Sequence, residues 1–146
     1  MYNMRYLLSL LFALSFYAKA SAQQAYELKP EESHFILLIP NDKMALSLEL
    51  ATEVSKYNAL YHLNDQLIVK RYKMDYLSSK GTICISGFDN LDIAQKYWAQ
   101  VLERSPDFNK GDMILYAWPI STSNFNTLIQ NKSKQGYLNF MNQNGF

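Results

Sequence analysis

The sequence predicts one α+β domain of order strand–helix–strand–strand–helix–strand, followed by one further helix. Three observations support this prediction. Four short segments rich in apolar or β-branched residues end at proline, glycine or turn residues, which is typical of strands. Two longer segments, between the first and second and between the third and fourth of these, repeat apolar residues three and four positions apart, which is typical of helices. The length of 146 residues is that of one domain.

The first 22 residues are expected to be a signal peptide. They contain no acidic residue, and Arg5 precedes an apolar run over 6–18. This run of about 13 residues is too short to span a bilayer, and Ala20-Ser21-Ala22 fits the small-residue rule for signal peptidase. We expect cleavage before Gln23, with an N-terminal membrane anchor as the alternative. No later apolar run approaches the roughly 18 residues of a span, so no membrane span is expected after cleavage.

Residues 23–33 are polar, contain Pro30 and are expected to form a short linker to a single domain over 34–142. The domain begins with a predicted strand, in which apolar residues follow His34 and end at Pro40. Because both alternating sets of side chains are apolar, this strand is expected to be central and covered on both faces.

A helix is expected over about 42–60, capped by Asn41 or Asp42. Its apolar stripe comprises Met44, Leu48, Ala51, Val54 and Tyr61. After a turn at 62–65, residues 66–75 mix apolar side chains with lysine and arginine. This mixture predicts a solvent-facing strand at a sheet edge, where lysine also discourages wrong pairing.

The second half repeats this order. Residues 78–81 predict a hairpin turn and 82–86 a strand with two unlike faces. Asp89 and Asn90 open a second helix, which ends near Pro106. Its stripe comprises Leu91, Ala94, Trp98, Val101 and Leu102, with Tyr97 adjacent. Residues 113–118 predict a strand that ends at Pro119.

Ser121–Ser123 are expected to cap a last helix, bent or interrupted at Gly136, before a tail over 143–146. The whole order is that of a ferredoxin-like split βαβ sandwich (βαββαβ) with an extra C-terminal helix. Right-handed crossovers would place the first two helices on one sheet face, with the first and third strands central. The extra helix would cover a sheet end or part of the second face.

Composition excludes several classes of protein. A formal net charge of +1, which cleavage would shift to −1, gives no general electrostatic basis for nucleic-acid binding. The single cysteine, Cys84, excludes an intrachain disulfide and multi-cysteine metal motifs. His34 and His62 lack neighbours at metal-ligand spacing, and phosphate-loop, dinucleotide and nucleophile-elbow motifs are absent. We predict no catalytic, cofactor-binding or metal-binding residues, and hence no enzyme.

One candidate interaction surface emerges from strand parity. Ile36 and Leu38 share one parity of the first strand, and Tyr116 and Trp118 share one parity of the fourth. If these parities meet on the face away from the first two helices, they form an apolar patch for a protein partner. The alternative is that the terminal helix buries it.

Three groups of residues carry a resemblance to a known family. They are Tyr57-Asn58 before Tyr61; Gly87-Phe88-Asp89-Asn90 leading to Ala94 and Tyr97-Trp98; and Ile120-Ser121 to Asn124-Phe125 with Leu128 and Tyr137-Leu138. Over about 33–142, the chain resembles the C-terminal domain that follows tetratricopeptide repeats in large lipoproteins of Bacteroidota type IX secretion and gliding motility. The resemblance implies a fold and an envelope location more than a site.

We therefore expect a non-enzymatic, exported protein-interaction module of the bacterial cell envelope. It would lie in the periplasm or on the periplasmic side of the outer membrane, with an unidentified envelope protein as its partner, and would be an accessory of the type IX secretion or gliding machinery. One alternative is a small-ligand-binding or enzymatic periplasmic domain with a pocket near His34, His62 or Cys84. Another is a self-associating structural subunit that forms homo-oligomers.

Overall fold

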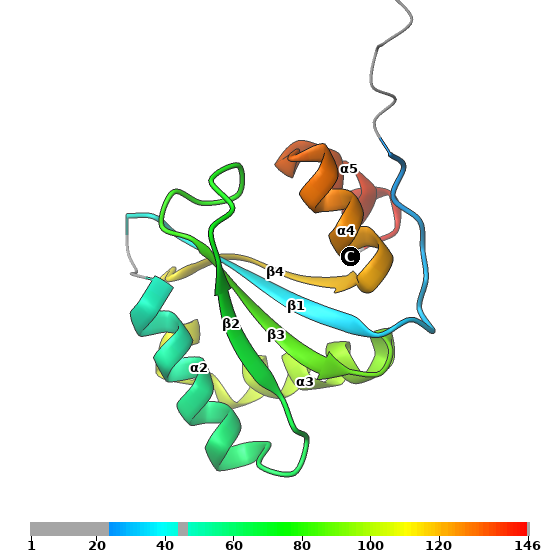
Figure 1. The fold of residues 1–146 in the computed structure, drawn as a ribbon. Helices are drawn as coiled ribbons and strands as arrows, with labels where there is room; N and C mark the ends of the chain where they lie inside the picture. The colour runs from blue at the N-terminus through cyan, green and yellow to red at the C-terminus, as the bar shows by residue number, and fades with distance from the viewer. Residues whose placement is uncertain (1–23, 44–46, 146) are drawn as a thin grey trace, which may run out of the picture.

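A computed structural model describes residues 24–43 and 47–145 (Figure 1). The predicted signal peptide over 1–22 and Met44 of the predicted first helix lie outside the described residues. Within the described part of the chain, no helix has both the length and the apolar character needed to cross a membrane.

The strands form one antiparallel sheet. They are β1 (His34–Pro40), β2 (Ile68–Tyr72), β3 (Thr82–Phe88) and β4 (Ile114–Ser121). The order across the sheet is β2-β3-β1-β4, and every neighbouring pair is antiparallel. The predictions that the first and third strands are central and that the 66–75 segment contributes an edge strand are confirmed.

Two helices cover one face of the sheet, α2 (Ser47–Tyr61) and α3 (Leu91–Arg104) (Figure 1). Ile36, Leu38 and Ile85 from the sheet pack there against Val54 of α2 and Val101 of α3. The prediction that the first two helices share a face is therefore confirmed. A short 3₁₀ helix, η1 (Asp107–Asn109), follows α3.

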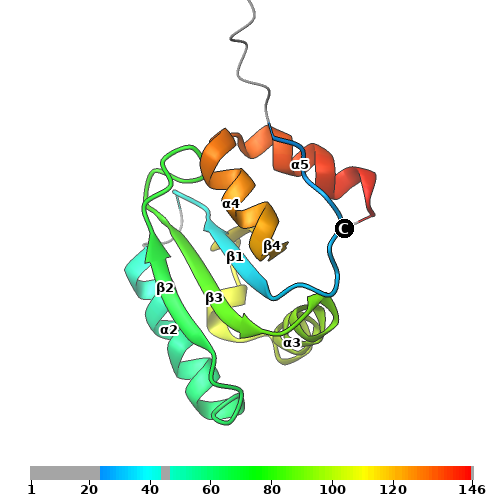
Figure 2. The ribbon, with the colours of Figure 1, turned by 45° about the vertical axis from the view of Figure 1, so that its right-hand side comes forward.

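The opposite face carries α4 (Thr122–Asn131) and α5 (Lys134–Gln143) (Figure 2). The single terminal helix of the prediction is thus two helices. The break lies at Lys132, whose φ of 48° is left-handed, and not at Gly136. The Ser133 hydroxyl then accepts from the Gly136 amide at 3.0 Å and caps α5, so Gly136 belongs to its first turn.

Local capping explains where α3 begins. The Asn90 side chain accepts from the Ile93 amide at 3.0 Å, as the sequence predicts. Asp42 has a different role from the predicted cap, because its carboxylate accepts from the side chains of Ser78 and Ser79 and from the Ser79 amide. These hydrogen bonds connect Asp42 to the loop that precedes β3.

β4 does not end at Pro119, where the sequence predicts its end, but continues to Ser121. Proline lacks an N–H, and a strand at a sheet edge tolerates this because it pairs on one side alone. The predicted tail is shorter as well, since α5 includes Gln143.

The predicted linker is part of the folded domain. Asn124 of α4 accepts from the Glu27 amide at 3.0 Å and donates to the Glu27 carbonyl at 2.7 Å. Two turns later, Asn131 makes the same pair of bonds to Gln24, at 3.1 and 2.7 Å. The segment over 24–33 therefore runs along the α4–α5 layer and is fixed to it.

Candidate functional site

The four residues of the predicted interaction surface lie on opposite faces of the sheet. Ile36 and Leu38 belong to the core under α2 and α3, whereas Trp118 and Tyr116 belong to the side covered by α4 and α5. Ile36, Leu38 and Trp118 are buried, and Tyr116 is half-buried. The prediction of one shared patch is wrong, because these residues of β1 and β4 point to opposite faces of the sheet. The alternative, burial by the terminal helix, holds for Trp118 and Tyr116, which α5 covers.

An apolar groove lies instead between α3 and β4. We define the α3–β4 groove by Ala94, Trp98, Ala99 and Leu102 on one wall and Ala117 and Pro119 on the other. Its volume is about 290 Å³. The three alanines leave space that larger side chains would fill, while Trp98 is half-buried and Leu102 is 55% exposed.

The groove results from the position of α3 over one side of the sheet. The apolar stripe of α3 predicts that Trp98 and Leu102 are core residues, but α3 lies over the β4 side of the sheet, and in the described part of the chain no further strand pairs with β4 there. Ala94 and Val101 are fully buried, whereas Trp98 and Leu102, which lie beyond β4, remain partly open to solvent. A helix stripe marks an apolar face without showing how much of that face the neighbouring elements cover.

A second cavity, of about 340 Å³, lies beside the end of α2 and is lined in part by His62, Asp65, Lys96 and Arg104. The His62 ring is buried, and its Nδ1 lies 2.7 Å from the Asp65 carboxylate. Its Nε2 is buried and has no hydrogen-bond partner among the described residues. Because Nε2 has no solvent-accessible surface, it does not line this cavity.

The His62 ring is part of an aromatic cluster that joins α2 to α3. It lies 4.8 Å from the Tyr97 ring, and Tyr97 donates to the Asn58 side chain at 2.7 Å. Burial raises the pKa of the Tyr97 hydroxyl well above its usual value. Tyr97 therefore stays neutral and acts as a structural donor between the two helices.

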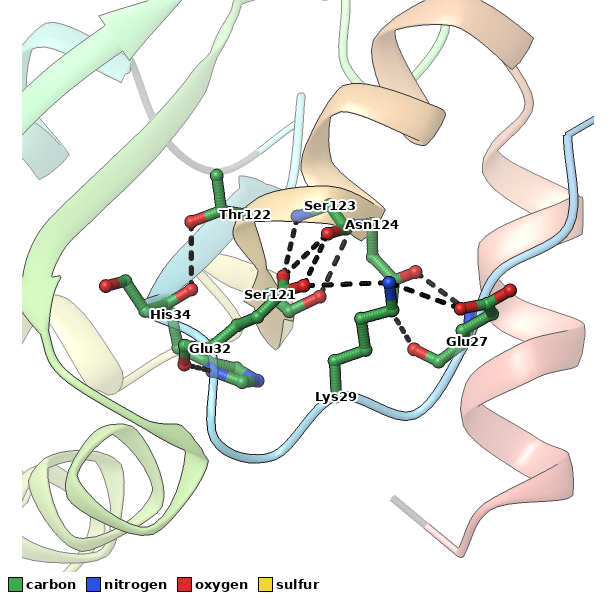
Figure 3. Close-up of polar contacts among 9 residues, drawn as sticks. Glu27, Lys29, Glu32, His34, Ser121, Thr122, Ser123 and Asn124 are labelled. Carbon is green, nitrogen blue, oxygen red and sulfur yellow. Dashed lines mark hydrogen bonds and ion pairs between the residues drawn. The ribbon is translucent and has the colours of Figure 1, made fainter.

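Figure 3 shows the polar network at the start of α4. The Glu32 carboxylate accepts from the Ser123 amide at 3.0 Å and from its hydroxyl at 2.6 and 2.7 Å. These bonds, led by the hydroxyl, hold the pKa of Glu32 below its usual value. The His34 Nδ1 lies 2.7 Å from the Glu32 backbone carbonyl, and among the described residues no hydrogen bond joins His34 to Ser123. The network supplies hydrogen-bond partners to the first turn of α4 and so acts as a helix cap.

Cys84 is buried in β3 under the α4–α5 layer. Burial raises the pKa of its thiol to about 12, against a weaker opposing effect of Lys70. A thiol in this state is a poor nucleophile at neutral pH, because the thiolate is the reactive form.

The structure does not bring His34, His62 and Cys84 together. Cys84 and the His62 cluster lie on opposite faces of the sheet. His34 pairs with Phe88, whereas Cys84 pairs with Leu37, three residues further along β1. Among the described residues, no three histidine, cysteine or acidic side chains are grouped so as to hold a metal ion.

Sequence reasoning missed the groove, although Ala94, Ala99 and Ala117 were a usable signal. Small residues beside a half-buried aromatic indicate a depression once the facing elements are known. Comparison of the chain with protein-family models, curated proteins and solved structures finds no match.

Proposed function

We propose that this chain is an exported, non-enzymatic protein-interaction module of the bacterial cell envelope, an accessory of a machine such as type IX secretion or gliding. The observation that carries the proposal is the α3–β4 groove. The resemblance to the C-terminal domains of envelope lipoproteins and the pattern over 1–22 support the location. The partner is a protein that inserts an apolar side chain between α3 and β4.

We also propose that the fold is a ferredoxin-like split βαβ sandwich with α4 and α5 as an added second layer. The strand order β2-β3-β1-β4 and the common face of α2 and α3 support this assignment. In this arrangement the crossover helix α3 lies over the β4 edge, which accounts for the groove.

The groove fits the chemistry of an interaction surface better than the His62 cavity fits that of an enzyme. Tryptophan is enriched at the centres of protein interfaces because its large ring gains much from losing water. Trp98 is held half-buried on the rigid α3, and the exposed Leu102 extends the apolar surface. A partner that fills the groove would remove this surface from water, and this burial would stabilise the complex by roughly 25 cal/mol per Å² of apolar area.

Site-specific cross-linking in the native cell tests the proposal. A photoreactive phenylalanine analogue replaces Leu102, and the control replaces Leu60, which is 71% exposed on α2. We expect a reproducible protein adduct at position 102 and none at 60. Adding Ala99→Lys, which places a long charged side chain in the groove, should abolish the adduct.

Equal adducts at both positions, or adducts at 102 that persist with Ala99→Lys, would contradict the groove as the binding surface. A cross-link to a second copy of the chain alone would support the self-associating alternative. Thermal unfolding is the control for folding, and we expect the Ala99→Lys protein to unfold as the unchanged protein does, since residue 99 is exposed.

A further inference from the structure

The charge of the chain is unevenly distributed over the fold. Residues 70–80, which comprise the end of β2 and the loop to β3, contain Lys70, Arg71, Lys73 and Lys80 but only one acidic residue, Asp75. All four cationic side chains are exposed. In the described ranges 24–43 and 47–145, none of the four lies within ion-pair distance of a carboxylate. The nearby Asp42 is already bound to Ser78 and Ser79.

The same strand forms an open edge of the sheet (Figure 2). β2 pairs with β3 alone, and no backbone group elsewhere in the described chain hydrogen-bonds to the backbone of Ile68–Tyr72. Half of the peptide groups of an edge strand point away from the sheet and can pair with an added strand.

The side chains of β2 set the sequence that an added strand would need. Lys70 pairs with Cys84 and so lies on the α4–α5 side, together with the exposed Ile68 and Tyr72. Arg71 pairs with Ile83 and lies on the opposite side. Residues directly opposite in a sheet favour opposite charges, so adjacent acidic residues flanked by apolar ones would match this edge.

We propose that the β2 edge binds an acidic, extended segment of a partner protein, which adds to the sheet as a fifth strand. This inference rests on the proposed function and names the chemistry of a partner segment. The lysine and arginine that discourage pairing between two copies of β2 are the groups that attract an acidic strand. Lys73 and Lys80 continue the positive surface around a polar hollow of about 320 Å³ with Ser79, where flanking carboxylates would lie.

Peptide binding to the protein purified after expression of the full chain tests this inference. The probe is a fluorescent peptide with the core Val-Glu-Glu-Thr-Val, measured by anisotropy. One control peptide replaces both glutamates with lysine. A second replaces the threonine with proline, which keeps the charge but prevents continuous strand pairing.

The double variant K70E/R71E should weaken binding of the acidic peptide about ten-fold or more, because two attractive cross-strand pairs become repulsive. The matched variant K132E/K134E changes the net charge equally at the junction of α4 and α5, where Lys132 is exposed and Lys134 is half-buried against Tyr116. It should leave binding within about two-fold, since its positions lie outside the edge. Hydrogen exchange of the Ile68–Tyr72 amides should slow when the acidic peptide is bound.

Several results would overturn the inference. These are absence of binding by the acidic peptide, equal binding of the proline peptide, equal weakening by K132E/K134E, and dimerisation of the peptide-free protein through β2. Because this assay uses purified protein and a synthetic peptide, its failure is distinguishable from loss of cross-linking at Leu102, which tests the α3–β4 groove in cells.

Discussion

Tyr137 offers a sharp test of whether the α4–α5 layer is an integral part of the domain. Its side chain is 1% exposed, and its hydroxyl donates to the Pro119 carbonyl of β4 at 2.8 Å. Its ring lies 5.2 Å from Trp118 and 5.1 Å from Tyr26 of the N-terminal segment. One side chain thus joins α5, β4 and the segment over 24–33.

Two substitutions separate the hydroxyl from the ring. Tyr137→Phe removes one neutral hydrogen bond and should lower the free energy of unfolding by about 1 kcal/mol, the usual value for such a bond. Tyr137→Ala also removes a buried ring that contacts both Trp118 and Tyr26, and should cost about 3–5 kcal/mol. The second loss is a large part of the roughly 5–15 kcal/mol that stabilises a domain of this size.

Urea unfolding followed by tryptophan fluorescence measures both effects, since Trp118 contacts Tyr137. Tyr116→Phe is the control, because Tyr116 is half-buried and its hydroxyl has no hydrogen bond in the described part of the chain. It should change stability by less than about 0.5 kcal/mol. If the Tyr137→Phe protein is as stable as the unchanged protein, the hydrogen bond to Pro119 does not contribute to stability. If the α4–α5 layer is an integral part of the domain, the Tyr137→Ala protein unfolds in one cooperative step. A separate transition at low urea concentration would contradict this.

Two further predictions concern titratable groups. Because hydrogen bonds from Ser123 lower the folded pKa of Glu32, this carboxylate adds stability above its unfolded pKa and loses that contribution as pH falls through the folded one. Glu32→Gln should therefore lower the free energy of unfolding at pH 7, by less than about 1 kcal/mol because water screens this partly exposed carboxylate. Urea unfolding at pH 7 and below the ordinary carboxyl value of 4.5 should show this difference from the unchanged protein shrinking in acid, and a difference independent of pH would contradict the assignment. Cys84, with its buried thiol and raised pKa, should react with a maleimide at pH 8 only when urea unfolds the domain, and rapid labelling of the folded protein, detected by mass spectrometry, would show that this part of the core is accessible.

Local patterns predicted most of the secondary structure, and their errors share a cause. The apolar run of β1 indicated burial on both faces, and both faces are covered. Pro119 predicted a strand end, but the edge position of β4 removed the cost of its missing N–H. Gly136 suggested a helix break, yet the left-handed Lys132 and the cap at Ser133 define it instead. The error at Pro119 arose because the position of β4 in the sheet decided the outcome, whereas the error at Gly136 arose because nearby residues of the same segment end α4 and cap α5.

The candidate surfaces depended even more on tertiary structure. The alternation of the β1 and β4 side chains was visible in the sequence, but which parity faces α2 and which faces α5 was not. The basic character of 66–75 was equally visible, and the prediction of an edge strand was correct. That no described backbone group outside β3 pairs with this strand follows from the assembled sheet alone.

The sequence by itself determined the number and order of the strands and the segregation of charge onto one segment, because these follow from the spacing of side chains along the chain. The predicted stripe of α2 was wrong at two positions, since Leu48 and Tyr61 are exposed while Leu50 and Tyr57 are buried. Tertiary structure decided which apolar side chains stay exposed. Trp98 and Leu102 carry the helical spacing of core residues, yet they line a groove because the sheet ends at β4. The polar segment over 24–33 resembles a linker, yet it is fixed because Asn124 and Asn131 bind its backbone. Whether a side chain is buried depends on the residues that pack around it, and many of these are brought close only when the chain folds.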